Sequence, residues 1–401
     1  MSKTILILGA SILQLPAIKE ALAMGLRVVA VDWNPDAIGF SEPGVKREVV
    51  STIDIPAVLE VAKRHRVDGV MTLASDMPMR SVAAVASALN LPGISQDCAI
   101  KATDKAEMRK ALEAAGVPIP KFFRAASEEE FWTATSKLTP PFMVKPADSS
   151  GSRGIFKIEP QKNDQASLAS AYAYSRSASR SGVVVVEEFM EGPEVSVETL
   201  TVDGVCHVIQ ITDKRTTGAP HFVETGHSQP SMLPETIKEE IRKAAIAANA
   251  AIGITSGPSH TEIIVTKDGP KIVELGARLG GDCITTHLVP LSTGVDLVRS
   301  CIEIALGETP AFLPTLHKGS AIRYFPQHAG KVLAIDGLKE AEKLPGIKQI
   351  SIVHGVGETI TEITDSASRM GFVIAQGESA QEAVDRCEAA LQQLDIKIQN
   401  S

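Results

Sequence analysis

The first hundred residues alternate between short apolar runs and longer segments in which apolar residues recur at helical spacing. The runs at 4–10, 27–35 and 68–75 are rich in β-branched and aliphatic residues, so each predicts a buried strand. Between and after them, the segments 13–25, 55–67 and 80–90 have the periodicity of amphipathic helices. A repeated strand–helix–strand order predicts a parallel, doubly wound sheet.

After about residue 100 the regular alternation of strand and helix patterns ends. A helix is expected to begin at a cap, Thr103 or Asp104, and to end at Gly116, and apolar runs at 141–147 and 154–159 flank a polar loop. Closely spaced runs over 182–216, reversed at Asp203 and Gly204, predict antiparallel strands. The pattern then predicts helices at 233–251 and 291–306, a strand pair over 259–278, and an α+β segment from 316 to 401.

We therefore predict a mixed α/β and α+β protein with three domains. The first covers residues 1–97 and the last covers 316–401. The domain between them covers 98–315 and divides into a smaller subdomain at 98–186 and a larger one at 187–315.

Composition narrows the class of function. The chain has 401 residues, 44% of them hydrophobic, and a net charge of −8, which argues against a nucleic-acid surface because phosphate binding needs clustered cations. Its five cysteines form no C-x-x-C pair, and no apolar run approaches the length of a spanning helix or signal sequence. We expect a cytoplasmic protein that acts on small molecules and has neither nucleic-acid nor membrane partners.

A glycine- and serine-rich loop is the first candidate for chemistry. Lys145 ends the apolar run before it, and no Gly-Lys-[Ser/Thr] sequence closes it, so it is not a Walker A loop. Loop N–H groups and hydroxyls can still cover a triphosphate while the strand lysine adds charge. The alternative is an ordinary polar hairpin. The candidate phosphate contacts in the loop are Ser149, Ser150, Gly151, Ser152 and Gly154.

A second candidate is the exit of the strand with four successive valines. A strand that runs out into a linker can give an adenine ring an apolar slot, an acceptor and a backbone N–H. Glu194, just beyond it, can accept hydrogen bonds from ribose hydroxyls. The alternative is a set of solvated acids beside a turn. The candidate adenine contacts are Glu187, Glu188, Phe189 and Met190.

The third candidate is a pair of glutamates in apolar strand patterns. Glu262 and Glu274 lie on either side of a Lys-Asp-Gly turn. Two half-buried carboxylates that face each other repel unless cations lie between them, and Mg²⁺ suits one or two carboxylates plus substrate phosphates. Arg278 follows at a distance from which it can reach the same phosphates. The alternative is a cross-strand pair on a solvent face.

Zinc is a further possibility, because His221, Glu224 and His227 fall within seven residues. Nearby glycine and proline residues exclude the helix that an H-E-x-x-H site needs, so zinc is disfavoured.

These parts, in this order, resemble the ATP-grasp superfamily over almost the whole chain. The resemblance rests on Lys105 in the helix segment TDKAEMRKAL, on Lys145 before its loop, on VEEFMEG, and on the segments TEIIV and VELGAR. It implies an N-terminal preATP-grasp domain, an ATP-grasp fold and a C-terminal α+β lid subdomain. It also implies ATP and Mg²⁺, or Mn²⁺, as cofactors.

Within the superfamily the chain is most similar to the L-amino-acid ligases that form dipeptides. The similarity implies that Glu224 and His227 line the acyl-substrate pocket, that Glu262 and Glu274 bind metal, and that Arg278 is catalytic. Gly276 departs from the wider family, which often has Asn there as a further ligand. Asp282 stands near a position that is bulky in some dipeptide ligases, which suggests a larger or cationic amine.

The implied reaction is ATP-dependent amide formation. A small carboxylic acid, expected to be an amino acid, becomes an acyl phosphate, and an amine then displaces phosphate under a closed Gly/Ser loop. The alternatives are activation of bicarbonate, as in related carboxylases, and a catalytically silent nucleotide-binding protein. We further expect a homodimer, and we read Arg323 as a surface-strand residue rather than a pocket residue.

Overall fold

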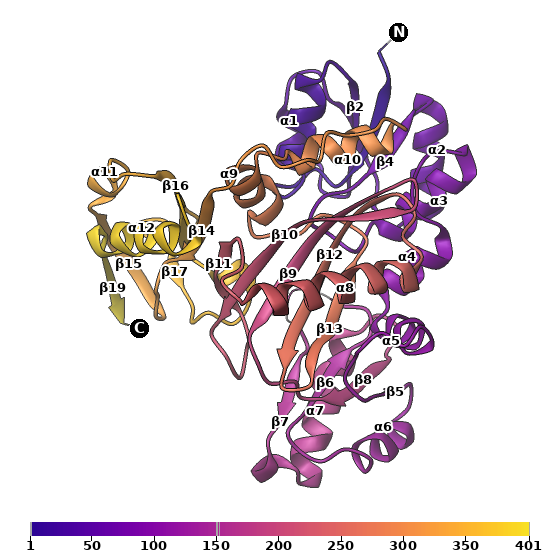
Figure 1. The fold of residues 1–401 in the computed structure, drawn as a ribbon, viewed down its shortest axis with the longest axis vertical. Helices are drawn as coiled ribbons and strands as arrows, with labels where there is room; N and C mark the ends of the chain where they lie inside the picture. Colours follow the sequence, from indigo (N-terminus) through magenta and orange to yellow (C-terminus); the bar gives the residue numbers. More distant parts are fainter. Residues whose placement is uncertain (1, 150, 152, 401) are drawn as a thin grey trace.

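A computed structural model of the chain describes residues 2–149, 151 and 153–400, and Figure 1 shows their arrangement. The N-terminal sheet has the order β3-β2-β1-β4, and every neighbouring pair is parallel. Its strands are β1 (Thr4–Leu8), β2 (Arg27–Asp32), β3 (Lys46–Val49) and β4 (Gly69–Met71). The helices between and after them are α1 (Leu15–Ala23), α2 (Ile55–His65) and α3 (Met79–Leu89), with η1 (Ile38–Ser41). The predicted parallel sheet is confirmed.

A second, antiparallel sheet lies at the opposite end of the molecule in Figure 1 and has the order β5-β8-β6-β7. The loop singled out in the sequence joins its strands β6 and β7. The elements of this region are β5 (Phe122–Ala125), α6 (Glu128–Thr135), β6 (Phe142–Pro146), β7 (Phe156–Ile158), η2 (Pro160–Lys162), α7 (Gln165–Ala178) and β8 (Val184–Glu188).

The largest sheet has eight strands in the order β13-β12-β9-β10-β11-β14-β18-β16, and α8 crosses one of its faces (Figure 1). It runs from the paired glutamates into the C-terminal segment, so it crosses the domain boundary that we predict at residue 316. Its elements, in chain order and with α8, are β9 (Glu194–Val202), β10 (Val205–Thr216), β11 (Glu224–Gln229), α8 (Glu235–Ile252), β12 (Gly257–Thr266), β13 (Gly269–Gly276), β14 (Gly319–Tyr324), β16 (Ile347–Ile352) and β18 (Gly371–Gly377).

A three-stranded antiparallel sheet, β17-β15-β19, lies near the C-terminus. Helix α12 packs against β14 and β18 of the large sheet, so it joins the C-terminal segment to that sheet. The remaining C-terminal elements are β15 (Gly330–Asp336), α11 (Leu338–Ala341), β17 (Thr359–Ile360), η4 (Ser366–Ser368), α12 (Ala380–Gln393) and β19 (Asp395–Asn400).

Two helical segments differ in detail from the sequence pattern. Before the predicted cap lies a separate helix, α4 (Gln96–Thr103), and Asp104 then caps α5 (Lys105–Ala114) by accepting from Ala106 and Glu107 N–H. The helix predicted at 291–306 is interrupted at Gly294, whose φ is +77°. The chain there forms η3 (Ile284–Leu288), α9 (Val289–Thr293) and α10 (Leu297–Ala305).

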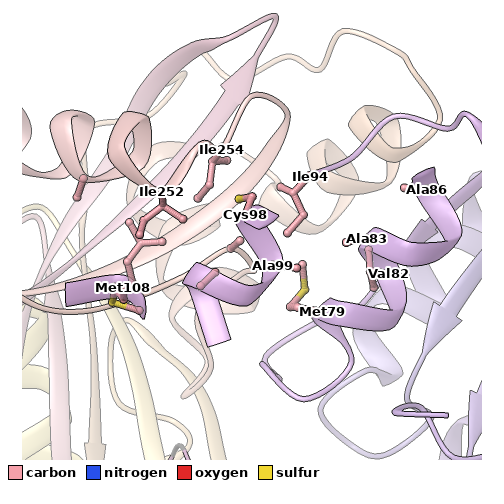
Figure 2. Close-up of a cluster of buried hydrophobic side chains, with 14 of the residues drawn as sticks. Met79, Val82, Ala83, Ala86, Ile94, Cys98, Ala99, Met108, Ile252 and Ile254 are labelled. Carbon is pink, nitrogen blue, oxygen red and sulfur yellow. The ribbon is translucent and has the colours of Figure 1, made fainter. Parts of the chain in front are cut away.

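Buried apolar side chains join the N-terminal sheet region to the large sheet. Figure 2 shows Met79 and Val82 of α3 beside Ala99 of α4, with Met108 of α5 and Ile252 of α8 continuing the same cluster. Met79, Met108 and Ile252 are each at most 5% exposed. Burial at this density fixes α3, α4 and α5 relative to one another. None of the helices in the described part of the chain combines the length and the apolar character needed to cross a bilayer.

Candidate active site

The predicted phosphate-binding lysine, Lys145, is one member of a buried triad of charged side chains. Lys145 on β6 places its Nζ 2.5 Å from Oε1 of Glu187 on β8, and Arg109 of α5 donates to Glu187 Oε2 at 2.9 and 3.1 Å. Burial alone would raise the pKa of Glu187, but the two cations outweigh it and lower the pKa to about 2. Glu187 is 2% exposed, so its carboxylate lies behind Lys145 rather than in an open slot.

The second lysine is tied to the start of the loop. Lys105 Nζ lies 2.7 Å from the carbonyl oxygen of Ser149 and 3.1 Å from Glu274 Oε2, so it links the loop to the glutamate pair. At the far end of the loop, Ser175 of α7 donates its hydroxyl hydrogen to the Gly154 carbonyl. Gly151 has a φ of +69° and open space around its Cα. Ser150 and Ser152 lie outside the described residues.

The predicted adenine segment follows the end of β8, an inner strand of the small sheet. Glu188 accepts from the Lys121 backbone N–H at 2.9 Å, and the Phe189 ring has Lys157 Nζ 3.9 Å from its centroid. Met190 is 9% exposed and contributes an apolar side chain. At Gly192 any Cβ would meet the Val265 carbonyl, so only glycine lets this linker pass so close to β12.

The two predicted metal ligands are cross-strand partners. Glu262 on β12 pairs directly with Glu274 on β13, as the sequence predicts. Lys214 and His260 flank Glu262 at 3.3 and 3.4 Å, while Lys105 flanks Glu274. Burial would raise the pKa of Glu262, but Lys214 and His260 hold it well below its ordinary value. The cations of the protein itself therefore favour the charged form of Glu262.

Lys214 is the centre of a cluster that the sequence analysis missed. Its Nζ lies 2.8 Å from Glu194 Oε1, and 3.3 Å from both Glu224 Oε1 and Glu262 Oε1. Burial would lower the pKa of Lys214, but these three carboxylates raise it well above its ordinary value. One lysine thus joins the candidate ribose, acyl-substrate and metal glutamates. No clear signal marks it in the sequence, because Lys214 stands between an aspartate and an arginine near the end of β10 and resembles one more charged strand-end residue.

The donor set suits magnesium better than zinc. In the described part of the chain no group of three or more His, Cys, Asp or Glu side chains could hold a metal ion. Glu224 and His227 lie on strand β11, so they do not share a helix with His221 as an H-E-x-x-H site would require. A pair of carboxylates that completes its coordination with phosphate oxygens and water is the arrangement that Mg²⁺ takes.

His260 is a second residue whose importance the sequence did not reveal. It lies within β12, and its Nδ1 is 2.6 Å from Oε1 of the fully buried Glu198. Burial alone would lower the pKa of His260, but Glu198 and Glu262 raise it to about 9. The imidazolium is therefore a fixed positive charge beside Glu262 at neutral pH.

Arg278 is held by a residue of the N-terminal sheet region. Its Nε and Nη2 donate to the two carboxylate oxygens of Asp76 at 2.8 and 2.9 Å, across 202 positions of sequence. The pair explains Gly276, because a Cβ at that position would lie 2.7 Å from Asp76 Oδ1. Here the Asp76 carboxylate fills the space that an asparagine side chain would need.

The candidate acyl pocket is closed by residues from the C-terminal segment. A β-bulge at Thr225 interrupts the regular register between β10 and β11. Glu224 Oε1 lies 3.3 Å from Nζ of Lys214, and Lys214 is the residue of β10 that pairs directly with His227. His227 Nε2 lies 3.3 Å from Asp282, whose two oxygens accept from Arg369 at 2.6 and 2.9 Å. Because Asp282 is already neutralised by Arg369, it does not offer a free charge to a cationic amine.

Arg323 is not the surface residue that we predict. It is 7% exposed, its Nη1 donates to the His227 carbonyl at 3.0 Å, and its Nε lies 3.3 Å from Glu388 of α12. On β14 it points away from the face that carries Tyr324, whose ring lies under Arg369 at 3.7 Å. Arg323 therefore supports the β11–β14 pairing from behind.

Two protein families match parts of this chain. Residues 138–286 match the ATP-grasp domain, and residues 323–399 match the L-amino acid ligase C-terminal domain 2. The chain is similar to the alanine–anticapsin ligase of Bacillus subtilis, at 26% identity over 376 residues that cover 84% of this chain and 75% of that one. It is also similar to the L-arginine-specific L-amino acid ligase of Bacillus subtilis, at 24% identity over 284 residues, covering 70% and 68% of the two chains.

Solved structures resemble the whole chain. An L-amino acid ligase from Bacillus licheniformis superimposes with a TM-score of 0.85 and 26% identity, covering 100% of this chain and 99% of that one. A phosphoribosylglycinamide synthetase from Anaerococcus prevotii has a TM-score of 0.78 and 21% identity, with 100% of both chains covered, and shares the fold. These likenesses confirm the fold class that the sequence predicts.

Proposed function

We propose that this chain is an ATP-grasp carboxylate–amine ligase, which activates the carboxyl group of an amino acid with ATP and joins it to an amine. The observation that carries the proposal is the facing pair Glu262 and Glu274, with Lys105 on one side and Arg278 four residues beyond. The match of residues 323–399 to an L-amino acid ligase domain supports an amino acid over bicarbonate as the activated acid.

In this proposal the nucleotide lies between the small sheet and the large one. Lys145, held by Glu187, and Lys105 balance the charge of the triphosphate, while the Gly/Ser loop covers it. The linker of Phe189 and Met190 receives the adenine ring. Glu262 and Glu274 would hold Mg²⁺ (Mn²⁺ is the other candidate), which supplies charge neutralisation to the β- and γ-phosphates when bound.

The reaction then proceeds in two steps. A carboxylate oxygen of the acid attacks the γ-phosphorus, the bond to the β-phosphate oxygen breaks, and ADP leaves an acyl phosphate. The neutral amine next attacks the acyl carbon, the acyl–oxygen bond breaks, and the departing phosphate takes the proton that the amine loses. Arg278 stabilises the charge on the transferring phosphoryl group and then on the tetrahedral oxyanion.

The acid is proposed to bind between β11 and the C-terminal segment. Glu224 offers a carboxylate to the α-ammonium group, and His227, 2% exposed and next to Asp282, faces the acyl phosphate. Water must be kept out because acyl phosphates hydrolyse, which gives the loop its role as a lid. The homodimer and the cytoplasmic location stay predictions from the sequence.

The test is ADP release by the purified chain with Mg-ATP. Single amino acids, pairs of amino acids and bicarbonate are supplied in turn, and mass spectrometry identifies any amide. We expect ADP only with particular pairs, in equal amounts with the amide, and loss of both in Glu274→Gln. Glu239→Gln, which changes an exposed glutamate on α8, is the matched control. ADP formation with bicarbonate alone would favour the carboxylase alternative, and ATP binding without turnover would favour the silent protein.

A further inference from the structure

Arg369 reaches from the C-terminal segment to the candidate acyl pocket, and none of the roles assigned above uses it. It lies just before β18, which is separated from β11 in the large sheet by β14 alone, and Figure 1 shows β11 and β14 side by side. The residue is 7% exposed, although arginine is rarely buried unless it is paired. Its partners therefore indicate what the burial is for.

The guanidinium group of Arg369 is held from several sides. Nη1 and Nη2 donate to the two carboxylate oxygens of Asp282 at 2.9 and 2.6 Å, which is a bidentate pair. Nε donates to the Ser366 carbonyl at 3.0 Å, and Nη1 also donates to the Glu224 carbonyl at 3.2 Å. The Tyr324 ring centroid lies 3.7 Å from the guanidinium carbon. A group with these partners is not free to turn, so it fixes the orientation of Asp282.

The backbone at Asp282 is strained. Asp282 and Cys283 have φ angles of +50° and +60°, a region that residues other than glycine rarely adopt. Such strain persists where the surroundings over-determine the conformation, and the bidentate pair with Arg369 does this here. The strained turn directs the Asp282 carboxylate at His227.

Asp282 in turn decides which ring nitrogen of His227 carries hydrogen. Burial would raise the pKa of Asp282, but Arg369 and His227 hold it below its ordinary value, so the carboxylate is ionised. An ionised carboxylate only accepts, so Nε2 of His227, 3.3 Å from Asp282 Oδ2, must carry the hydrogen. Nδ1 of the neutral ring is then an acceptor. It is buried and has no hydrogen-bond partner among the described residues.

A buried acceptor without a partner lowers stability, and a ligand N–H that binds there recovers the loss. Glu224, on the same strand as His227, is the carboxylate proposed above for the α-ammonium group of the acid. Ser366 of the C-terminal segment donates its hydroxyl hydrogen to Glu224 Oε2 at 3.3 Å. The C-terminal segment therefore contacts both Glu224 and the partner of His227.

We propose that Arg369 is a positioning residue for the acid substrate: through Asp282 it keeps the hydrogen of His227 on Nε2, so that Nδ1 accepts a hydrogen bond from the α-ammonium group. In this arrangement Arg369 itself does not touch the substrate. The assignment rests on the proposed ligase function, because it concerns how the first substrate of that reaction is recognised.

Two different substitutions should then have the same effect. In Asp282→Asn the amide oxygen accepts from Arg369 and the amide NH₂ donates to Nε2 of His227, which moves the ring hydrogen to Nδ1. In Arg369→Met the Asp282 carboxylate loses its cation and favours a His227 ring that is protonated on both nitrogens. In both variants Nδ1 becomes a donor and no longer accepts from an ammonium group.

Nitrogen NMR of the full chain, labelled with nitrogen-15 in histidine, measures the tautomer without any substrate. The His227 signals are identified by their loss in His227→Gln. We expect hydrogen on Nε2 alone in the unmodified chain, on Nδ1 in Asp282→Asn and on both nitrogens in Arg369→Met. Arg369→Lys keeps a cation beside Asp282 and should keep the Nε2 tautomer. Arg299→Met changes an exposed arginine on α10 and is the matched control.

Steady-state kinetics, with the amino acid that serves as the acid in the ADP-release assay, tests the consequence. In Asp282→Asn and Arg369→Met the KM for that amino acid should rise about 10- to 100-fold, as for loss of a hydrogen bond to a charged group, while the KM for ATP stays unchanged. Because the effect acts through His227, Arg369→Met should add nothing further to a chain that already carries His227→Gln. A residue that only stabilises the fold would add its effect in both backgrounds.

Two results would overturn the proposal while the ligase activity stands. One is hydrogen on Nδ1 of His227 in the unmodified chain, a result that needs no variant at Arg369 to fold. The other is an effect of Arg369→Met that is as large in the His227→Gln background as in the unmodified chain. If no pair of amino acids yields an amide, the proposed function fails, and the NMR spectra still decide whether Arg369 sets the tautomer of His227.

Discussion

The buried triad of Arg109, Glu187 and Lys145 gives a sharp test of how the phosphate side of the site is built. In Glu187→Gln the side chain keeps its size but loses its charge. Two buried cations then remain, since Arg109 and Lys145 are 2% and 8% exposed. Removing one partner of a buried pair is costly because the other charge stays desolvated without compensation.

The magnitude follows from the pKa of Glu187. A carboxyl whose pKa falls from 4.5 to about 2 on folding contributes about 3 kcal/mol at neutral pH. This contribution is complete above the unfolded pKa of 4.5 and is lost as the pH falls toward 2. At pH 7 the variant should therefore lose about 3 kcal/mol in the free energy of unfolding, or about 4 °C in Tm for a chain of 401 residues. The Kd for ATP should rise about tenfold because Lys145 loses its anchor.

Urea unfolding at pH 7 and pH 4, together with calorimetric titration of ATP, measures these effects. Glu129→Gln is the matched control, because Glu129 is an exposed glutamate in the first turn of α6. The difference in stability between Glu187→Gln and the unmodified chain should narrow at pH 4. A Glu187→Gln protein as stable as Glu129→Gln at pH 7, with unchanged ATP affinity, would refute the role of Glu187 behind Lys145.

Two further predictions concern the other end of the site. In steady-state kinetics, Gly276→Asn should lower kcat/KM by about tenfold or more, because its Cβ would lie 2.7 Å from Asp76 Oδ1 and disturb the ion pair between Asp76 and Arg278. Adding Asp76→Ser to the same chain should recover part of the loss. Full activity of the single variant would contradict this explanation. Because folding raises the pKa of His260 from 6.5 to about 9, protonated His260 contributes about 3 kcal/mol of stability below pH 6.5, and this contribution is lost as the pH rises through 9. Measured by urea unfolding between pH 6 and 9.5, the free energy of unfolding should depend less steeply on pH in Glu198→Gln than in the unmodified chain. An equal slope in the two proteins would disprove the coupling of His260 to Glu198.

Much of the fold was readable because it depends on local pattern. The alternation of apolar strands and amphipathic helices over 4–90 predicts the parallel sheet, and Asp104 and Gly116 mark the ends of α5 as expected. The cross-strand pairing of Glu262 with Glu274 also follows from the turn between them. The break at Gly294 and the buried position of Arg323 were missed, because each depends on packing against distant elements.

The candidate site was readable only in part. Lys145, Glu262 and Arg278 have sequence contexts that suggest charge in a buried strand or at its end. Their partners do not, because Arg109 reads as one more polar residue on an amphipathic helix and Asp76 as a loop acid. A sequence window cannot show that a helix 78 residues away neutralises Glu187.

By itself, the sequence determined which segments become strands and helices, and which residue types can hold a triphosphate, a divalent cation and an acyl group. These follow from periodicity, turn chemistry and the ligands that each charge prefers. Only the tertiary structure decided which charges are paired: Lys214 with three glutamates, His260 with Glu198, and Arg278 with Asp76. The physical reason is that pairing energies depend on distance and burial, and both are set when strands and helices far apart in the chain pack together.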